Sequence, residues 1–473
     1  MARYIPVLLI ALLLTGKAWA GQPRQQQAER PAIDIQITGM QPGLAYLIGT
    51  FADQQFRADS AQVDREGRML FQPAAPYAAG LYYLWLPDRK TLQILLDEDQ
   101  TFTLKTRAGE LAAAMEAEGS LENELLYRNL KFEEQYSAAA TEASSRLQQL
   151  PPDSPRYQEA KVALDELVER RKAHLEEIFS RYPSALFTQY KKAGQNPEVR
   201  EIFNKDGTLD TALQVYFYRT DFWENVDFSD ERLLHTPVIA NKLQRYIKTL
   251  TVQHPDSINA AAKFLVDQVL GYPEYYKFFV NWIALQYQPT KSSLMDSEAV
   301  FVFMVENYIT QERAFWSDSL QTWALQKRAG EMAASLVGKQ APDVKAKGPD
   351  GQYHSIYEIE APYIIVFMYN PTCDHCIEET PKLVRFYREW QSQGVEVFAI
   401  ALDTEDAEWK DFIARNGMDW VNVFDPTNRS IYGKYWVDIT PELYVLNPER
   451  KIIGKNLKVH QIEAIIQRDK ENR

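Results

Sequence analysis

The 473-residue sequence predicts a multidomain protein with an N-terminal antiparallel β domain, a central all-α domain and a C-terminal α/β domain. Three changes of pattern support this. Short runs of period-two alternation fill residues 32–108, helical apolar spacing fills residues 118–333, and strands alternate with helices from about Val337 onward. The expected boundaries are a signal peptide at 1–20, a small β domain at 21–115, a helical domain at 116–333 and an α/β domain at 334–473.

The first twenty residues have the pattern of a secretory signal. Arg3 supplies a positive start, residues 7–14 are apolar, and Ala18-Trp19-Ala20 has the small-x-small spacing of a cleavage site. This apolar run is shorter than the roughly 20 residues that span a bilayer. We therefore expect export and no integral membrane segment after cleavage; an uncleaved anchor is the alternative.

The charge balance excludes some classes of partner. Removal of residues 1–20 would remove Arg3 and Lys17, which leaves 50 basic against 65 acidic side chains, a net charge of −15. A protein this acidic is not expected to bind nucleic acid or an anionic membrane surface. Hydrophobic residues make up 45% of the chain and aromatic residues 12%, which is enough to build substantial cores.

The β region begins with Ile33–Ile37, which alternates between apolar and polar residues. Glu66-Gly67 and Pro87-Asp88-Arg89 are turn signals between later strands. Short strands at this spacing predict an antiparallel sandwich or an open barrel. Further strands are expected at 45–48, 56–63, 68–71, 81–86, 91–96 and 101–104.

The helical region opens with a long amphipathic helix from about Leu121, which Pro151-Pro152 ends, and a second long helix at 157–182. Shorter helices dense in aromatic residues follow. These aromatic runs could line a groove for an unfolded client, but apolar helical stripes are usually buried, so we expect them in the helix–helix core. The runs are Tyr216–Tyr218, Phe222-Trp223, Tyr275-Tyr276, Phe278-Phe279 and Trp282.

The C-terminal region opens its main sheet with Ile364–Met368, a nearly continuous apolar strand. Alternating strands and helices with a terminal hairpin predict a mixed sheet covered by helices on both faces. The expected helices are 375–391, 407–415 and 461–468, and the further strands are 395–400, 420–424, 442–446 and 451–454.

The chain has only two cysteines, Cys373 and Cys376, placed between that strand and the following helix. Two thiols at this spacing suit reversible dithiol/disulfide exchange without a cofactor. Because the helix N-terminus favours a thiolate, Cys373 is expected to attack and Cys376 to be the buried resolving thiol. The alternatives are a structural disulfide or half of a zinc site, but zinc normally takes four ligands and there is no second cysteine pair.

His375 lies between the two cysteines. Its imidazole could donate a hydrogen bond or positive charge to the Cys373 thiolate, which would lower the thiol pKa and make the disulfide more oxidising. Asp374 opposes this effect with a negative charge. The alternative for His375 is an exposed imidazole without a role.

Further motifs surround the cysteines: the entry segment Gly338–Asp343, Pro381 five residues after Cys376, and Thr440-Pro441 before the strand at 442–446. With them, the C-terminal segment resembles the thioredoxin fold, and more narrowly the exported TlpA/ResA-like thiol-disulfide oxidoreductases. The order of β, helical and redox domains is similar to multidomain proteins of Bacteroidetes-type bacteria. The resemblance implies a periplasmic protein of a Gram-negative bacterium.

The resemblance also implies roles for other residues. Glu379 could relay a proton to or from Cys376, and Thr440 with a cis-Pro441 would bind the client chain. The implied partners are client proteins with disulfides or thiols and an unidentified thiol electron donor. The implied activity is reduction of client disulfides; the alternatives are a disulfide oxidase or isomerase, or a client-binding protein with a redox-sensing dithiol.

The sequence departs from related patterns in two ways. Pro371-Thr372 stands where thioredoxins usually have a tryptophan before the first cysteine, and Phe367 stands where thioredoxin has a buried aspartate. Proton transfer must therefore differ, which favours Glu379 or water. The peroxiredoxin pattern also fails, because Val366 and Asn370 occupy its Pro and Thr/Ser positions.

Overall fold

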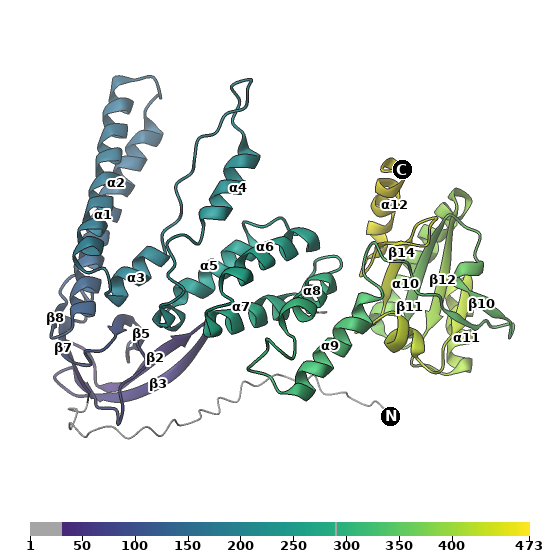
Figure 1. Cartoon of the computed structure of the whole chain (residues 1–473), viewed down its shortest axis with the longest axis horizontal. Helices are drawn as coiled ribbons and strands as arrows, with labels where there is room; N and C mark the ends of the chain where they lie inside the picture. Colours follow the sequence, from purple (N-terminus) through teal and green to yellow (C-terminus); the bar gives the residue numbers. More distant parts are fainter. Residues whose placement is uncertain (1–30, 289–290) are drawn as a thin grey trace.

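The structure is a computed structural model that describes residues 31–288 and 291–473 (Figure 1). A β region, a helical region and an α/β region follow one another along the chain, which confirms the predicted fold class. The β region and the α/β region lie at opposite ends of the molecule, with helices between them. The expected signal at 1–20 lies outside the described residues.

The β region consists of two four-stranded sheets, with strand orders β4-β1-β7-β8 and β3-β2-β5-β6. One pair, β1 with β7, is parallel, a departure from purely antiparallel pairing. β8 pairs with β7 beyond the boundary expected at 115, so the sheet continues to residue 118. The strands are β1 (Ala32–Thr38), β2 (Gly43–Phe51), β3 (Gln54–Val63), β4 (Arg68–Phe71), β5 (Gly80–Trp85), β6 (Thr91–Leu96), β7 (Thr101–Arg107) and β8 (Glu116–Glu118).

The helical region starts with a long hairpin, α1 and α2, that projects from the rest of the molecule (Figure 1). α5, α6 and α7 each begin with a proline, which costs no intrahelical hydrogen bond at that position. The elements are α1 (Leu121–Gln149), α2 (Pro155–Arg181), α3 (Leu186–Ala193), α4 (Thr211–Asp221), η1 (Glu231–His235), α5 (Pro237–Lys248), α6 (Pro255–Gln268), α7 (Pro273–Gln286), α8 (Glu298–Tyr308) and α9 (Ser319–Ala333).

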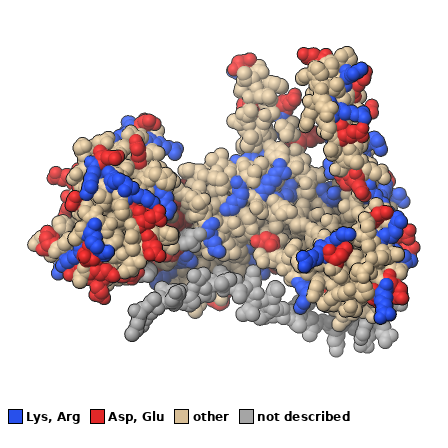
Figure 2. Space-filling model, turned by 180° about the vertical axis from the view of Figure 1, so that it is seen from behind, with Lys and Arg blue, Asp and Glu red and all other residues tan. Residues whose placement is uncertain are grey.

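The aromatic runs divide into two groups. Phe222, Trp223, Tyr275 and Phe279 lie in the helical core, as the periodicity predicts. Tyr216, however, is 60% exposed, and none of the described residues of α4 is buried. The expectation of a core position was therefore wrong for Tyr216, whereas Tyr218 is partly buried against the helical core. α4 projects from the rest of the helical region and shows mostly uncharged residues (Figure 2). Helical spacing places apolar residues on one face, but it does not supply the element that covers that face.

The α/β region is built on a seven-stranded sheet of order β10-β9-β13-β12-β11-β14-β15. The central strand β11 is parallel to β12 and antiparallel to β14, and all its residues are buried. The elements are β9 (Lys345–Lys347), β10 (Tyr353–Ser355), η2 (Ile356–Glu358), β11 (Tyr363–Tyr369), α10 (Asp374–Trp390), η3 (Gln391–Gln393), β12 (Val395–Ala401), α11 (Asp406–Asn416), β13 (Val421–Phe424), η4 (Ser430–Lys434), β14 (Glu442–Leu446), β15 (Ile452–Gly454), η5 (Val459–Gln461) and α12 (Ile462–Glu471).

The two faces of this sheet carry separate apolar cores. Leu443 and Val445 of β14 share one core with Cys376 and α10, whereas Tyr444 and Leu446 belong to the core on the opposite face. This alternation is the period-two pattern of a strand. In the part of the chain that the structure describes, no helix combines the length and the apolar character needed to cross a membrane.

Candidate redox site

The two cysteines occupy the junction between β11 and α10. Cys373 is the N-cap residue of α10, with extended backbone angles, and its carbonyl accepts the N–H of Ile377 at 3.0 Å. Cys376 lies in the first turn of the helix. Both side chains are free thiols; that of Cys373 is partly exposed, whereas that of Cys376 is fully buried. Any partner protein can therefore reach only the first sulfur.

The surroundings separate the two thiols electrostatically. Burial raises the pKa of Cys373, but hydrogen bonds from the backbone N–H and side chain of Cys376 outweigh it and leave the pKa below its ordinary value. The helix N-terminus acts in the same direction. Burial raises the pKa of Cys376 to about 12. At neutral pH the exposed thiol is thus the better source of a thiolate.

The Thr440-Pro441 segment lies against the exposed thiol. The peptide bond between these residues is cis, as the family pattern implies. The Sγ of Cys373 is 3.2 Å from the carbonyl oxygen of Thr440, to which the thiol donates. The structure thus brings together Cys373, Cys376, Thr440 and Pro441, all of which were selected from the sequence.

Asn370 is a contact residue that the sequence interpretation missed. Its backbone N–H donates to the Sγ of Cys376 at 3.4 Å, and its side-chain oxygen accepts from the backbone N–H of Thr372 at 2.7 Å. These bonds hold the loop between β11 and Cys373. An asparagine directly after a buried strand and before Pro371 is a recognisable turn residue, which was the available signal.

Among the described residues, the side chains of His375 and Glu379 form no hydrogen bond to either sulfur atom. The side chain of His375 is exposed, and its backbone N–H contributes to lowering the pKa of Cys373. The Glu379 carboxylate is 12% exposed and accepts from the Nζ of Lys382 at 2.8 Å. Glu379 is therefore close to Cys376 along the helix but is held by a lysine.

Two further positions concern proton transfer. Phe367 is fully buried and stacks on Tyr369, with ring centroids 5.0 Å apart. An apolar ring therefore occupies the position at which thioredoxin has a buried aspartate.

The sequence interpretation did not single out Glu442, the buried first residue of β14. Its carboxylate accepts a hydrogen bond from the hydroxyl of Tyr444 at 2.9 Å. Burial raises the pKa of Glu442 to about 8. It shares the face of Tyr444, opposite the face of Cys376.

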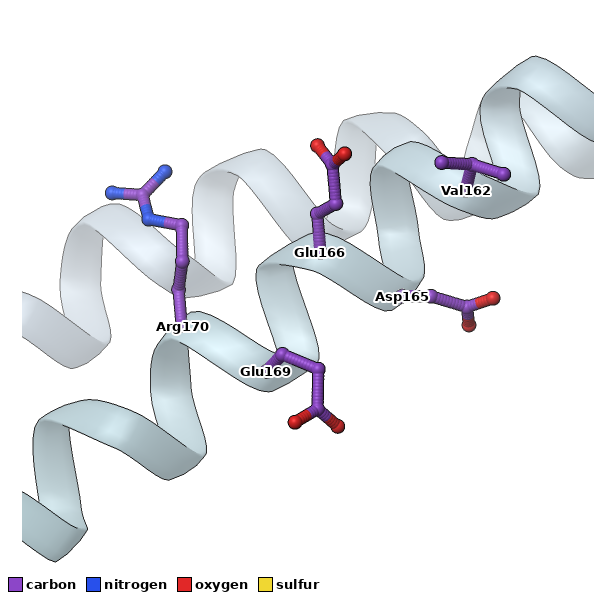
Figure 3. A pocket seen from close by; sticks show the side chains of 5 residues that line it. All are labelled: Val162, Asp165, Glu166, Glu169 and Arg170. Carbon is purple, nitrogen blue, oxygen red and sulfur yellow. The ribbon is translucent and has the colours of Figure 1, made fainter.

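Within residues 31–288 and 291–473, no group of three or more His, Cys, Asp or Glu side chains is arranged to hold a metal ion. A surface hollow on α2 is lined by side chains of that one helix, and its acidic groups spread apart (Figure 3). The lining residues are Val162, Asp165, Glu166, Glu169 and Arg170.

Two parts of the chain match known protein families. Residues 337–455 match the AhpC/TSA family. Residues 166–330, which include most of the helical region, match a family described only as a domain of unknown function, DUF5106.

Curated relatives of this AhpC/TSA region are thiol-disulfide oxidoreductases. ResA of Bacillus subtilis is 24% identical over 116 residues, which are 24% of this chain and 64% of that protein. ResA of Bacillus anthracis is 24% identical over 136 residues, which are 28% of this chain and 78% of that protein. The chain thus spans just under two thirds of the first relative. These relatives confirm the predicted resemblance to ResA-like thiol-disulfide oxidoreductases.

Two solved structures are also similar. A domain of a possible thiol-disulfide isomerase from Cytophaga hutchinsonii is 31% identical and covers 30% of this chain and 97% of that chain, with a TM-score of 0.28. A thioredoxin-like protein from Bacteroides caccae is 18% identical and covers 58% of this chain and 98% of that chain, with a TM-score of 0.48.

Proposed function

We propose that this protein is an exported thiol-disulfide oxidoreductase that reduces disulfides of client proteins through Cys373 and Cys376. The observation that carries the proposal is the asymmetry of the two thiols. Cys373 is accessible and its pKa is lowered, whereas Cys376 is buried and its pKa is raised. An accessible attacking thiol beside a buried resolving thiol is the arrangement that dithiol exchange requires.

In the proposed reaction, the Cys373 thiolate attacks one sulfur of the client disulfide. A mixed disulfide forms, and the other client sulfur leaves as a thiolate. Cys376 then loses its proton and attacks the Sγ of Cys373, which closes the Cys373–Cys376 disulfide and releases the second client thiolate. Two electrons pass to the client, and an external dithiol donor restores the reduced pair.

The segment around Thr440 is the proposed client-binding edge. Its backbone lies beside the reactive sulfur and could pair with an extended client chain. The neighbouring Ile439 is largely exposed, and so is Ile377 on α10. These two side chains would favour clients with apolar residues around the disulfide.

The decisive test is covalent trapping. Cys376→Ser, incubated with insulin as a disulfide substrate, should accumulate a mixed disulfide at Cys373 that is detected by non-reducing electrophoresis and mass spectrometry. Cys373→Ser should give neither adduct nor turnover. Retention of wild-type exchange by Cys373→Ser would falsify the assignment, and tight non-covalent binding without any adduct would favour a client-binding protein with a sensor dithiol.

The direction of electron flow is tested by the reduction potential of the pair. A value near about −270 mV, as in thioredoxin, supports a reductase, and a value near about −120 mV, as in DsbA, supports an oxidase. The exposed imidazole of His375, which forms no hydrogen bond to the sulfur of Cys373 among the described residues, supports the reductase over the oxidase. Export is tested separately: the mature protein recovered from the periplasm should begin at Gly21.

A further inference from the structure

The loop before Thr440 is anchored by the helical region. Arg328 of α9 reaches across the domain junction, with its Nη2 3.5 Å from the Oδ2 of Asp438. Its guanidinium lies 5.3 Å from the ring centroid of Trp436 and 5.6 Å from that of Phe301 on α8. Trp436 in turn donates from its Nε1 to the Oδ1 of Asp438 at 3.0 Å. Arg328 therefore contacts both Trp436 and Asp438, the two residues that hold the loop before Thr440.

This anchor is close to the reactive sulfur along the chain. Asp438 precedes Thr440 by two residues, and the Thr440 carbonyl is the group 3.2 Å from the Sγ of Cys373. Ile439, between them, remains largely exposed. The helical region thus holds the base of the loop while its tip stays open beside Cys373.

A second contact holds the loop after β15. Lys455 is almost fully buried, with its Nζ 3.6 Å from Glu298 of α8 and 3.8 Å from Asp296. Asn456 donates to the same Glu298 carboxylate at 2.8 Å, and the N–H of Val337 donates to Asp296 at 2.9 Å. These buried groups join the two regions through charge-assisted hydrogen bonds and ion pairs.

The loop after β15 also borders the redox helix. η5, which follows this loop, packs against α10. Lys382 is the main cause of the lowered pKa of Glu378, in the early part of α10, and the charge of Lys458 adds a small contribution. The helical region therefore anchors two loops of the redox region, one directly at Cys373 and one against the helix that carries it.

We propose that the helical domain positions the client-binding edge: Arg328 is a positioning residue that holds the Trp436–Pro441 loop in register for a protein client, and Glu298 supports the neighbouring loop. This inference rests on the proposed function and assigns a task to the region matched only to a family of unknown function. A small disulfide needs only the sulfur of Cys373, whereas an extended client chain must also align with Thr440. Misplacement by about 1 Å can cost up to roughly a hundredfold in rate.

Arg328 is the better residue to test. Its side chain is 31% exposed, so truncation leaves fewer buried groups unpaired than truncation of Lys455 or Glu298 would. Lys327, the preceding residue of α9, is the matched control, because its ion pair is with Glu331 on the same helix. Asp438→Ala removes the same contact from the other side.

The experiment compares wild type, Arg328→Ala, Asp438→Ala, the double variant and Lys327→Ala. The readouts are kcat and KM with insulin, the rate with oxidised glutathione, and the reduction potential of the cysteine pair. Arg328→Ala should lower kcat/KM for insulin by about tenfold, mainly through KM. Its glutathione rate should stay within about twofold and its potential should not change. Asp438→Ala should lower kcat/KM for insulin to the same extent, and the double variant should show no larger loss than either single variant.

The possible results separate failure of the positioning role of Arg328 from failure of the proposed thiol-disulfide exchange. If wild type exchanges both disulfides and Arg328→Ala matches it on insulin, the positioning role is wrong. If both rates and the thermal midpoint fall together, Arg328 is only structural and the inference is again wrong. If wild type exchanges neither disulfide, the proposed function itself fails.

Discussion

The carbonyl oxygen of Thr440 accepts a hydrogen bond from the thiol of Cys373 at 3.2 Å, across 67 residues of sequence. Only the protonated sulfur can donate to this carbonyl, whereas the side chain of Thr440 helps to lower the pKa of Cys373. The N–H groups of the helix start favour the thiolate. The reactive sulfur therefore lies between a group that stabilises its resting form and groups that stabilise its attacking form.

The first prediction concerns the ionisation of the two thiols. The pKa of Cys373 is lowered below 9.0 and that of Cys376 is raised to about 12. Alkylation of the reduced protein by iodoacetamide should therefore occur at Cys373, with a pH midpoint of the rate below 9. Peptide mass spectrometry gives the site, and the pH profile of the rate gives the pKa.

Cys376→Ser should keep a single alkylation event, and Cys373→Ser should react slowly throughout the neutral range. Equal modification of both cysteines at pH 7 in folded wild type would contradict the asymmetry of the site.

The second prediction concerns the proton of Cys376. Because burial keeps this thiol protonated, resolution of the mixed disulfide needs a proton acceptor. Glu379→Gln cannot accept a proton, so it should prolong the mixed disulfide by at least about tenfold while Cys373 attacks at the wild-type rate; general bases commonly contribute roughly a hundredfold or more. Rapid acid quenching measures both steps.

Glu378→Gln is the control for this experiment. Glu378 is 68% exposed and accepts from the same Lys382 Nζ at 2.8 Å. Glu378→Gln should leave the rates of attack by Cys373 and of resolution by Cys376 unchanged. The same mixed-disulfide lifetime in Glu379→Gln and wild type would assign proton transfer to water.

The third prediction concerns His375. Its imidazole is exposed, and an exposed charge is strongly screened by solvent. His375→Ala should therefore shift the reduction potential of the pair by less than about 30 mV, the equivalent of about 1.4 kcal/mol. Equilibration in glutathione buffers measures this value. A much larger shift would mean that the imidazole contacts the sulfur during the reaction.

The fourth prediction concerns Glu442 and stability. Burial raises its pKa from 4.5 to about 8, so between these values the folded protein binds more protons than the unfolded chain. The free energy of unfolding of wild type should therefore fall as pH rises through this window. Glu442→Gln stays neutral and should be more stable than wild type at pH 8.5, by a few kcal/mol at most at about 1.4 kcal/mol per pKa unit.

Urea unfolding at several pH values measures this difference. Glu449→Gln, a change at an exposed acid in the turn after β14, is the control and should keep the wild-type slope. Parallel pH profiles for Glu442→Gln and wild type would show that the carboxyl is ionised in the folded state.

The sequence predicted those parts of the site that depend on neighbouring residues. The spacing of Cys373 and Cys376 between a buried strand and a helix gives their positions, and the family pattern supplied Thr440-Pro441. The Arg328–Asp438 contact joins residues 110 positions apart, and no local pattern encodes it. Glu442 was visible as an acid in an apolar strand, but its burial depends on how the two regions pack.

The sequence did not predict very short strands, long-range strand pairing or which apolar helix faces are covered by other elements. β9 and β10 have three residues each, which is too few for a period-two signal. The parallel pairing of β1 with β7 depends on where the chain returns after five intervening strands. The apolar residues of α4 have the spacing of a helix, and only the tertiary structure shows that none of them is fully buried.

The complete burial of Cys376 has a kinetic consequence. In the proposed reaction, client and electron donor must both react at the Sγ of Cys373, one after the other. The enzyme then alternates between two covalent forms, and double-reciprocal plots at several donor concentrations should be parallel lines. At high concentration, the client should also bind the disulfide form of the enzyme, and the donor should also bind the dithiol form. Turnover should therefore pass through a maximum as the concentration of either partner is raised.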